Sequence, residues 1–130
     1  MKATLTNYQQ SPRKVRLIAD LIRGKSTVRA RELLAFADKK SAPAMLKLLE
    51  SAVSNARGVG AQTDNLFIKD IQVNMGLTMG RIMPMARGQA HRFRKRRASV
   101  IMVLDVKKTT PKETKKNVTK TLSKKKAKTS

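Results

Sequence analysis

Apolar residues alternate with polar ones in two stretches of the second half of the chain. In strict alternation, every second residue faces the same side, which is typical of a β-strand buried on one face. The two runs have the following members: Ile71, Val73, Met75, Leu77 and Met79, then Ala98, Val100, Met102, Leu104 and Val106. This pattern predicts the two strands of one hairpin over residues 70–106.

The first sixty residues have the helical period instead. A helix is predicted from Ser11-Pro12 to Gly24, with its apolar stripe formed by Val15, Ile18, Ala19, Leu21 and Ile22. A second helix begins at Ser26 or Thr27, and a third runs from Ser41 to Gly58 and Gly60. Residues 3–8 are rich in strand formers. We therefore expect an α+β fold, with three helices packed on a small three-stranded antiparallel sheet, mainly through the first and third helices.

The predicted hairpin is too long for the domain that carries it. A strand from about Leu66 to Pro84 would extend roughly 60 Å at ~3.3 Å per residue, whereas a domain of about 100 residues has a radius of gyration of only ~13 Å. Pro84 and Gly88 place the turn between them, within a tip at about residues 80–90. Since an isolated two-stranded ribbon is marginal in water, the hairpin is either disordered alone or held by a partner.

The charge of the chain indicates what that partner is. The net charge is +22, from 30 Lys and Arg against 8 Asp and Glu in 130 residues. Residues 107–130 contain ten lysines and one glutamate, and this composition predicts a disordered basic tail. Subtracting the +9 of the tail from +22 leaves +13 on residues 1–106, the predicted single domain. Nucleic acid is the favoured partner, and a membrane surface is the second choice.

Other compositional features limit the function further. The chain has no cysteine, which excludes disulfides and thiolate metal sites. It has no apolar run suited to a signal peptide or a membrane span, so we expect a soluble cytoplasmic protein that does not bind membranes. One Tyr, three Phe and no Trp argue against an aromatic platform for stacking single strands.

Basic side chains gather at the tip and on the returning strand. Residues 81–97 contain seven Lys or Arg and no acid. In strand register, Arg92, Arg94 and Arg96 share one face, and Lys95 and Arg97 share the other. Protection of an edge strand against aggregation requires far fewer charges, so these residues favour nucleic acid, whose phosphates arginine binds in a bidentate manner.

The first turn of the first helix is also basic. It contains Arg13, Lys14 and Arg16 at the positive end of the helix dipole. Alone, a charged helix face is as often simply solvated. This placement is nevertheless unfavourable unless phosphates compensate for it.

Catalytic and metal chemistry have little support. His91 is the only histidine, and no acid lies between Asp70 and Asp105 to orient it. Met75 and Met79 continue the apolar alternation, so we expect them to pack in the core. Met83 and Met85 flank Pro84 and are too few for a soft-metal site, but they could contact a passing chain. We expect no enzyme activity, no cofactor and no bound metal.

Three motifs resemble one known family in order and spacing. They are SPRKVRLIADLIRGK at residues 11–25, LLESAVSNA at residues 48–56 and RIMPMARGQAHRFRKR at residues 81–96. Together they resemble the large-subunit ribosomal protein family numbered twenty-two over about residues 2–106. The sequence departs from the family pattern at Gly80, Met85 and Gln89, where relatives usually carry Lys or Arg. These departures imply a tip that is more apolar than those of its relatives.

The resemblance implies a structural protein of the large ribosomal subunit in the cytoplasm. Its globular part would lie near the exit of the polypeptide tunnel, and its hairpin would contact several rRNA domains and support early subunit assembly. The tip would line the tunnel, facing the fourth large-subunit protein and the nascent polypeptide. The tip residues are Arg81, Ile82, Met83, Pro84, Met85, Ala86, Arg87, Gly88 and Gln89. The rRNA-binding residues are Arg13, Lys14, Arg16, Arg23, Lys25, Arg81, Arg87, His91, Arg92, Arg94, Lys95, Arg96 and Arg97.

Two other function classes are alternatives to the ribosomal one. A histone-like DNA-binding protein would share the charge, but the long asymmetric hairpin supports it little unless the chain dimerises. An enzyme is the third alternative. Co-sedimentation with large subunits at moderate salt would favour the ribosomal interpretation, and association with the nucleoid would favour the histone-like one.

Overall fold

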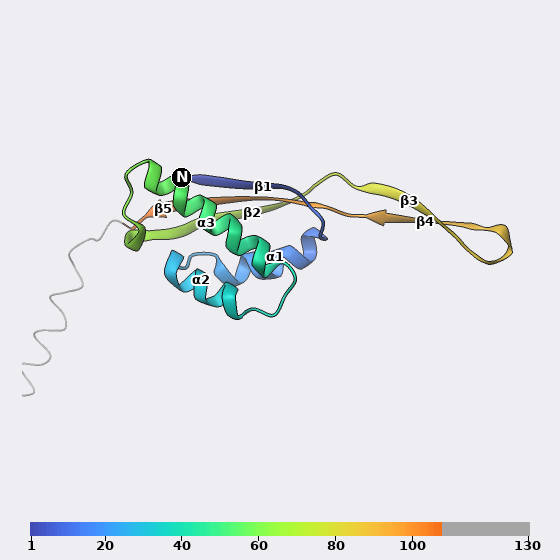
Figure 1. Ribbon diagram of the computed structural model, residues 1–130, viewed down its shortest axis with the longest axis horizontal. Helices are drawn as coiled ribbons and strands as arrows, with labels where there is room; N and C mark the ends of the chain where they lie inside the picture. Colours follow the sequence, from blue (N-terminus) through green and yellow to red (C-terminus); the bar gives the residue numbers. More distant parts are fainter. Residues whose placement is uncertain (108–130) are drawn as a thin grey trace, which may run out of the picture.

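A computed structural model describes residues 1–107, apart from the side chain of Asp64, and the predicted tail lies outside this range from residue 108 onward. Figure 1 shows a compact part from which a two-stranded arm projects, formed by residues 79–95. The helices and strands follow one another as β1 (Lys2–Tyr8), α1 (Pro12–Ile22), α2 (Thr27–Phe36), α3 (Ala42–Gly58), η1 (Thr63–Asn65), β2 (Leu66–Met75), β3 (Met79–Pro84), η2 (Ala86–Gly88), β4 (Ala90–Lys95) and β5 (Ala98–Val106). The expected α+β architecture is confirmed.

The sheet of the compact part has three antiparallel strands in the order β1-β5-β2. Strand β5 lies in the middle, with Met102 opposite Ala3 on one side and Ile71 on the other. These three residues are buried, so they belong to the face that meets the helices. The apolar residues at alternating positions of residues 98–104 therefore lie on the face of the sheet that meets the helices, as the sequence predicts.

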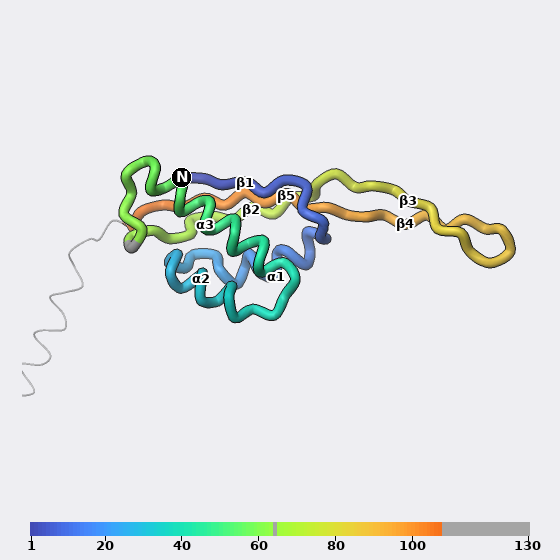
Figure 2. Tube along the Cα trace, viewed as in Figure 1, coloured from blue at the N-terminus to red at the C-terminus, as the bar shows by residue number. Residues whose placement is uncertain are grey.

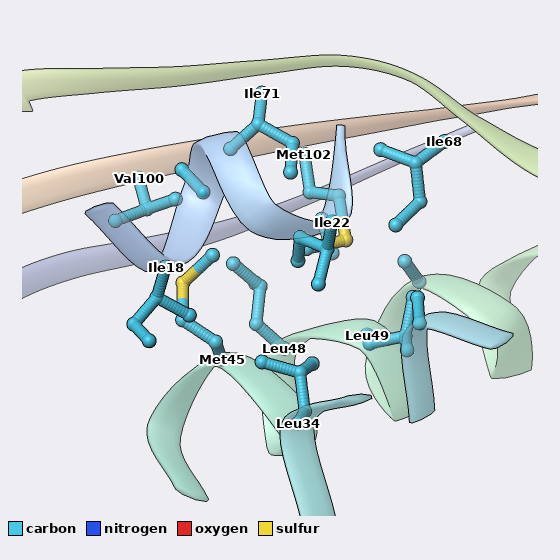
Figure 3. Packing of buried hydrophobic residues seen from close by; sticks show 14 of the residues in the cluster. Ile18, Ile22, Leu34, Met45, Leu48, Leu49, Ile68, Ile71, Val100 and Met102 are labelled. Atoms are coloured by element: carbon cyan, nitrogen blue, oxygen red, sulfur yellow. The ribbon is translucent and has the colours of Figure 1, made fainter. Parts of the chain in front are cut away.

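The core lies between this face and the helices. Helix α1 packs on β2, and α3 packs on β1 and β5, while α2 mainly contacts α3. Figure 3 shows Ile18 and Ile22 of α1 meeting side chains of α3 and of the sheet. Ile22, Leu49 and Met102 are almost completely buried. Such close-packed interiors make the loss of even a few methyl groups costly.

The chain after α1 covers the free edge of β2. Gly24, with φ +74°, ends the helix in the left-handed conformation that glycine adopts readily. Its N–H donates to Ile68 O at 3.1 Å, and Ile68 N–H donates to Lys25 O at 2.9 Å. Arg16 of α1 and Arg23, which follows α1, continue this edge, because Arg16 donates to Val73 O and Arg23 to Ile71 O, each at 3.0 Å. The edge is thereby closed to pairing with another chain.

The hairpin does not continue as one uninterrupted pair of strands. The outgoing chain breaks at residues 76–78 and the returning chain at residues 96–97, so β3 and β4 form a separate two-stranded sheet. We call this break the neck. There Gly76 N–H donates to Arg97 O at 2.8 Å. A Cβ on Gly76 would lie only 3.3 Å from the backbone of Arg97. The outgoing and returning segments of the hairpin can therefore approach closely here because residue 76 has no side chain.

The expected packing of Met75 and Met79 is wrong. Met75 is 70% exposed, Leu77 64% and Met79 38%, although all three continue the alternation. The helices cover β2 only as far as Val73, which is buried, and no core surface lies beyond it. Leu21, predicted to widen the α1 stripe, is likewise 40% exposed. Alternation identifies the faces of a strand, whereas burial also requires an element that covers one face.

Candidate nucleic-acid interface

The arm has no contact with the core. Every residue from Leu77 to Arg92 is exposed. Figure 2 shows the outgoing and returning segments of the arm running side by side away from the helices. The turn lies where the sequence predicts it, because Met85 N–H donates to Gln89 O at 2.8 Å and Gly88 has φ +68°. Arg87 also has a positive φ, of 60°, in the left-handed region. The arm is a thin ribbon with solvent on both faces.

The register of β3 and β4 distributes charge to both faces. Gly80 lies opposite Arg94, and Ile82 lies opposite Arg92. Because directly opposed residues share a face, these pairs form one side of the arm. Pro84 opposite Ala90 continues this side, and three pairs form the other: Met79 with Lys95, Arg81 with Phe93, and Met83 with His91. Both faces are basic, as predicted, and neither has a core to cover it.

Arg96 and Arg97 depart from the predicted strand faces. Both lie in the neck after β4 ends at Lys95, so they do not extend the alternation of Arg92 and Arg94. The Arg97 guanidinium contacts Met79 Sδ at 3.3 Å, and its carbonyl oxygen accepts the hydrogen bond from Gly76. Arg97 is therefore part of the connection between arm and domain as well as part of the basic surface.

The arm's positive charges have no acidic neighbours. Among residues 1–107, the ion pairs all lie in the compact part and join Arg23 to Asp20, Arg29 to Glu32, Arg31 to Glu50, and Lys69 to Asp105. The stretch 81–97 contains no acid at all. A ribbon with seven uncompensated cations in its sequence repels itself unless an external anion is present.

The first turn of α1 adds a second basic surface next to the neck. Arg16 contacts Val73 near the end of β2, so α1 begins at the side of the domain from which the arm leaves (Figure 1). Arg13 and Lys14 are exposed there. The structure thus places these residues at the same end of the domain as Arg96 and Arg97 of the neck, which are about 80 positions away in the chain.

Three predicted anchors also have structural contacts that the sequence did not reveal. Arg16 and Arg23 donate to carbonyl oxygens at the edge of β2, and Lys25 accepts a backbone hydrogen bond there. Only their position beside the apolar stripe, where a helix residue can reach a neighbouring strand, could have indicated this role. Arg13 and Lys14 make no such contact among the described residues.

Three side chains of the compact part, Tyr8, Lys69 and Asp105, have shifted pKa values. The hydrogen bond from Lys69 lowers the pKa of Asp105, and the same pair raises the pKa of Lys69. Burial raises the pKa of Tyr8, whose hydroxyl donates to Lys40 O at 3.0 Å. Within residues 1–107, no three His, Asp or Glu side chains gather into a metal-binding group. No helix of this range is long and apolar enough to cross a membrane.

Comparison with known proteins agrees with this architecture. The family described as "Ribosomal protein L22p/L17e" matches residues 3–105. The large ribosomal subunit protein uL22 of Acholeplasma laidlawii (strain PG-8A) is 40% identical over 104 residues, which cover 79% of this chain and 94% of that protein. The protein of the same name from Syntrophotalea carbinolica is 42% identical over 107 residues, covering 82% of this chain and 97% of that protein.

These matches extend over the compact part and the whole arm. The chain therefore belongs to the ribosomal protein L22p/L17e family. This family consists of structural proteins of the large ribosomal subunit. The family resemblance of the three sequence motifs is confirmed.

Proposed function

We propose that this protein, as a structural constituent of the large ribosomal subunit, binds rRNA through its arm and the first turn of α1. One observation carries the proposal: residues 77–92 are all exposed on a ribbon without acids. Such a ribbon is marginal in water by itself, and rRNA would supply both the anions and the surface that support it. Residues 1–106 act in this proposal as a single rRNA-binding domain.

The binding mechanism is electrostatic and geometric. Arg92 and Arg94 on one face and Arg81 and Lys95 on the other allow the arm to lie between RNA segments and neutralise phosphates on both sides. RNA of this kind is recognised mainly through its shape and backbone. Each phosphate neutralised steepens the salt dependence of binding by about 0.7 to 0.9 in a log–log plot. By joining RNA segments, the arm would support early assembly of the subunit.

The tip fits the finer role that the family resemblance implies. Ile82, Met83 and Met85 are exposed by 65%, 48% and 53% at the far end of the arm. An apolar surface there can contact a passing polypeptide, and methionine adapts to many partners. We therefore propose that residues 81–89 line the polypeptide exit tunnel, facing the fourth large-subunit protein and the nascent chain. The compact part would lie near the tunnel exit.

Incorporation into subunits tests the rRNA-binding role. In the test variant, Arg92, Arg94 and Arg96 are replaced by Glu. The matched control reverses three lysines of the compact part instead: Lys39, Lys40 and Lys47. On a sucrose gradient, we expect the control and the wild-type chain to sediment with large subunits at moderate salt and the arm variant to remain at the top.

The same gradient separates the alternatives. Equal incorporation of the arm variant would remove these arginines from the rRNA-binding set. Association of the wild-type chain with the nucleoid, and not with subunits, would support the histone-like alternative.

A further inference from the structure

A small groove lies between α2 and α3, at the end of the domain opposite the arm. Its volume is about 150 Å³, below the roughly 300–1,000 Å³ of sites for drug-sized ligands. Thr63 of η1 closes one end, just before β2 begins and runs toward the neck. The groove is therefore separate from every basic residue assigned above to the arm or to the first turn of α1.

The floor of the groove is apolar. Leu49 and Val53 of α3 are 1% and 7% exposed and continue directly into the core. Val28 of α2 also lines the groove and is 58% exposed. A flat apolar group entering the groove would cover Val28 without disturbing the two buried residues.

Polar groups surround this floor. The hydroxyl of Thr27 donates to Thr63 O at 3.4 Å, a long hydrogen bond that a ligand could replace. Arg31 and Arg57 line the groove, and no acid does among the side chains that the structure describes. Arg31 lies 4.0 Å from Glu50 in a half-exposed pair, which is weak. Across residues 1–63 and 65–107, Arg57 has no ion-pair partner.

We propose that this groove binds one unstacked nucleotide of the large-subunit rRNA. The base would lie mainly on Val28, above the buried Leu49 and Val53, and the adjoining phosphates would be bound by Arg31 and Arg57. Proteins recognise single-stranded RNA in this way, by holding a splayed base against a flat or apolar surface and contacting its edges with polar groups. Arginine suits both tasks, because its planar guanidinium stacks on bases and binds phosphate.

The charge of the groove favours RNA over a protein side chain. Among the described side chains, two cations and no acid line this space, which is too small for a folded partner segment, and Thr63 also lines it. The inference rests on the proposed rRNA-binding function. It adds a second RNA contact at the opposite end of the domain, so that the compact part is held at both ends.

The test is filter binding of the full-length chain to deproteinised large-subunit rRNA over a series of salt concentrations. The test variant combines Arg31→Ala with Arg57→Ala. The matched control combines Arg29→Ala with Lys47→Ala, which removes the same charge from the same two helices outside the groove. We expect the groove variant to bind about tenfold more weakly per arginine, as for hydrogen bonds to charged groups. Its salt slope falls by about 0.7 to 0.9 per arginine.

A second pair of variants tests the base contact. Val28→Asp places a carboxylate on the groove wall, and Phe36→Asp makes the same change at a 93% exposed position of the same helix. We expect only Val28→Asp to weaken RNA binding beyond the effect of one lost charge. Circular dichroism of both variants checks that they fold.

The outcomes separate the groove from the arm. Equal losses in the groove variant and its control would overturn the groove and leave the proposed function intact. A groove variant that binds isolated rRNA normally but fails to enter subunits would assign the groove to a protein, and so also overturn the proposal. Failure of the wild-type chain to bind the RNA would overturn the proposed function together with the groove.

Discussion

Shortening the arm should leave the stability of the compact part almost unchanged. A register-preserving deletion removes residues 82–92 and joins Arg81 to its partner Phe93 through Asn-Gly, a sequence suited to a two-residue turn. Every deleted residue is exposed, so almost no core burial is lost. Removing Arg87 and Arg92 also reduces charge repulsion. We expect the free energy of unfolding to change by less than about 0.5 kcal/mol, as for surface changes.

A core substitution provides the scale for this comparison. Ile71 is 1% exposed in the middle of β2, opposite Met102 of β5. Its replacement by alanine should lower the free energy of unfolding by about 2–5 kcal/mol. For a domain of this size, 1 kcal/mol corresponds to a shift in Tm of about 4–8 °C. The shortened chain should therefore melt within about 4 °C of wild type, and Ile71→Ala at least about 8 °C lower.

Thermal unfolding followed by far-ultraviolet circular dichroism measures both effects. In filter binding on the same samples, the shortened chain should still bind rRNA, because it keeps five of the seven cations of residues 81–97, but more weakly than wild type, whereas Ile71→Ala should bind normally below its Tm. A shortened chain that melts as low as Ile71→Ala would refute the separation of arm and core. So would loss of its helical signal at low temperature.

Three further predictions concern the edge of β2, the neck and a surface ion pair. Arg16→Ala leaves Val73 O without the two N–H donors of Arg16 and should lower the free energy of unfolding by about 1–3 kcal/mol. Urea unfolding without RNA measures this loss, and an unchanged urea midpoint would contradict a stabilising role of Arg16 at the edge of β2. Gly76→Val, which crowds the Arg97 backbone, should cost about 1–3 kcal/mol in the same assay, whereas Gly80→Val, with open space around it, should cost much less. The pKa of Asp105 is lowered in the folded state, so its contribution to stability is present above its unfolded pKa of about 3.9 and lost as the pH falls through the lower folded pKa. Asp105→Asn should thus be less stable than wild type near neutral pH and equal to it in strong acid, and a difference that persists in acid would contradict this assignment.

Much of the compact part could be predicted from local patterns. Helix α1 begins after Ser11 and ends before Gly24, as proline at the first helical position and glycine after the last turn indicate. The register of β5 follows from the alternation of residues 98–104, because a shift by one residue would expose the whole core face. The basic arm and its turn were also predictable, from a long run without acids that contains one proline and one glycine.

The groove and the edge contacts could not be predicted in the same way. Arg31 and Arg57 are 26 positions apart and look like ordinary solvated residues on their helices. They approach one space only because α2 and α3 pack together. The bonds from Arg16 and Arg23 to β2 likewise depend on which strand lies at the edge of the sheet.

The apolar positions, the basic positions and the place of the turn follow from the amino-acid order alone, since these are properties of side chains and of local backbone geometry. The extent of the core depends instead on how the helices pack on the sheet. Met75, Leu77 and Met79 satisfy the same alternation as Ile71 and Val73, yet they are exposed because the helices end before them. Burial requires a second surface, and its position depends on the packing of the whole chain rather than on the strand alone.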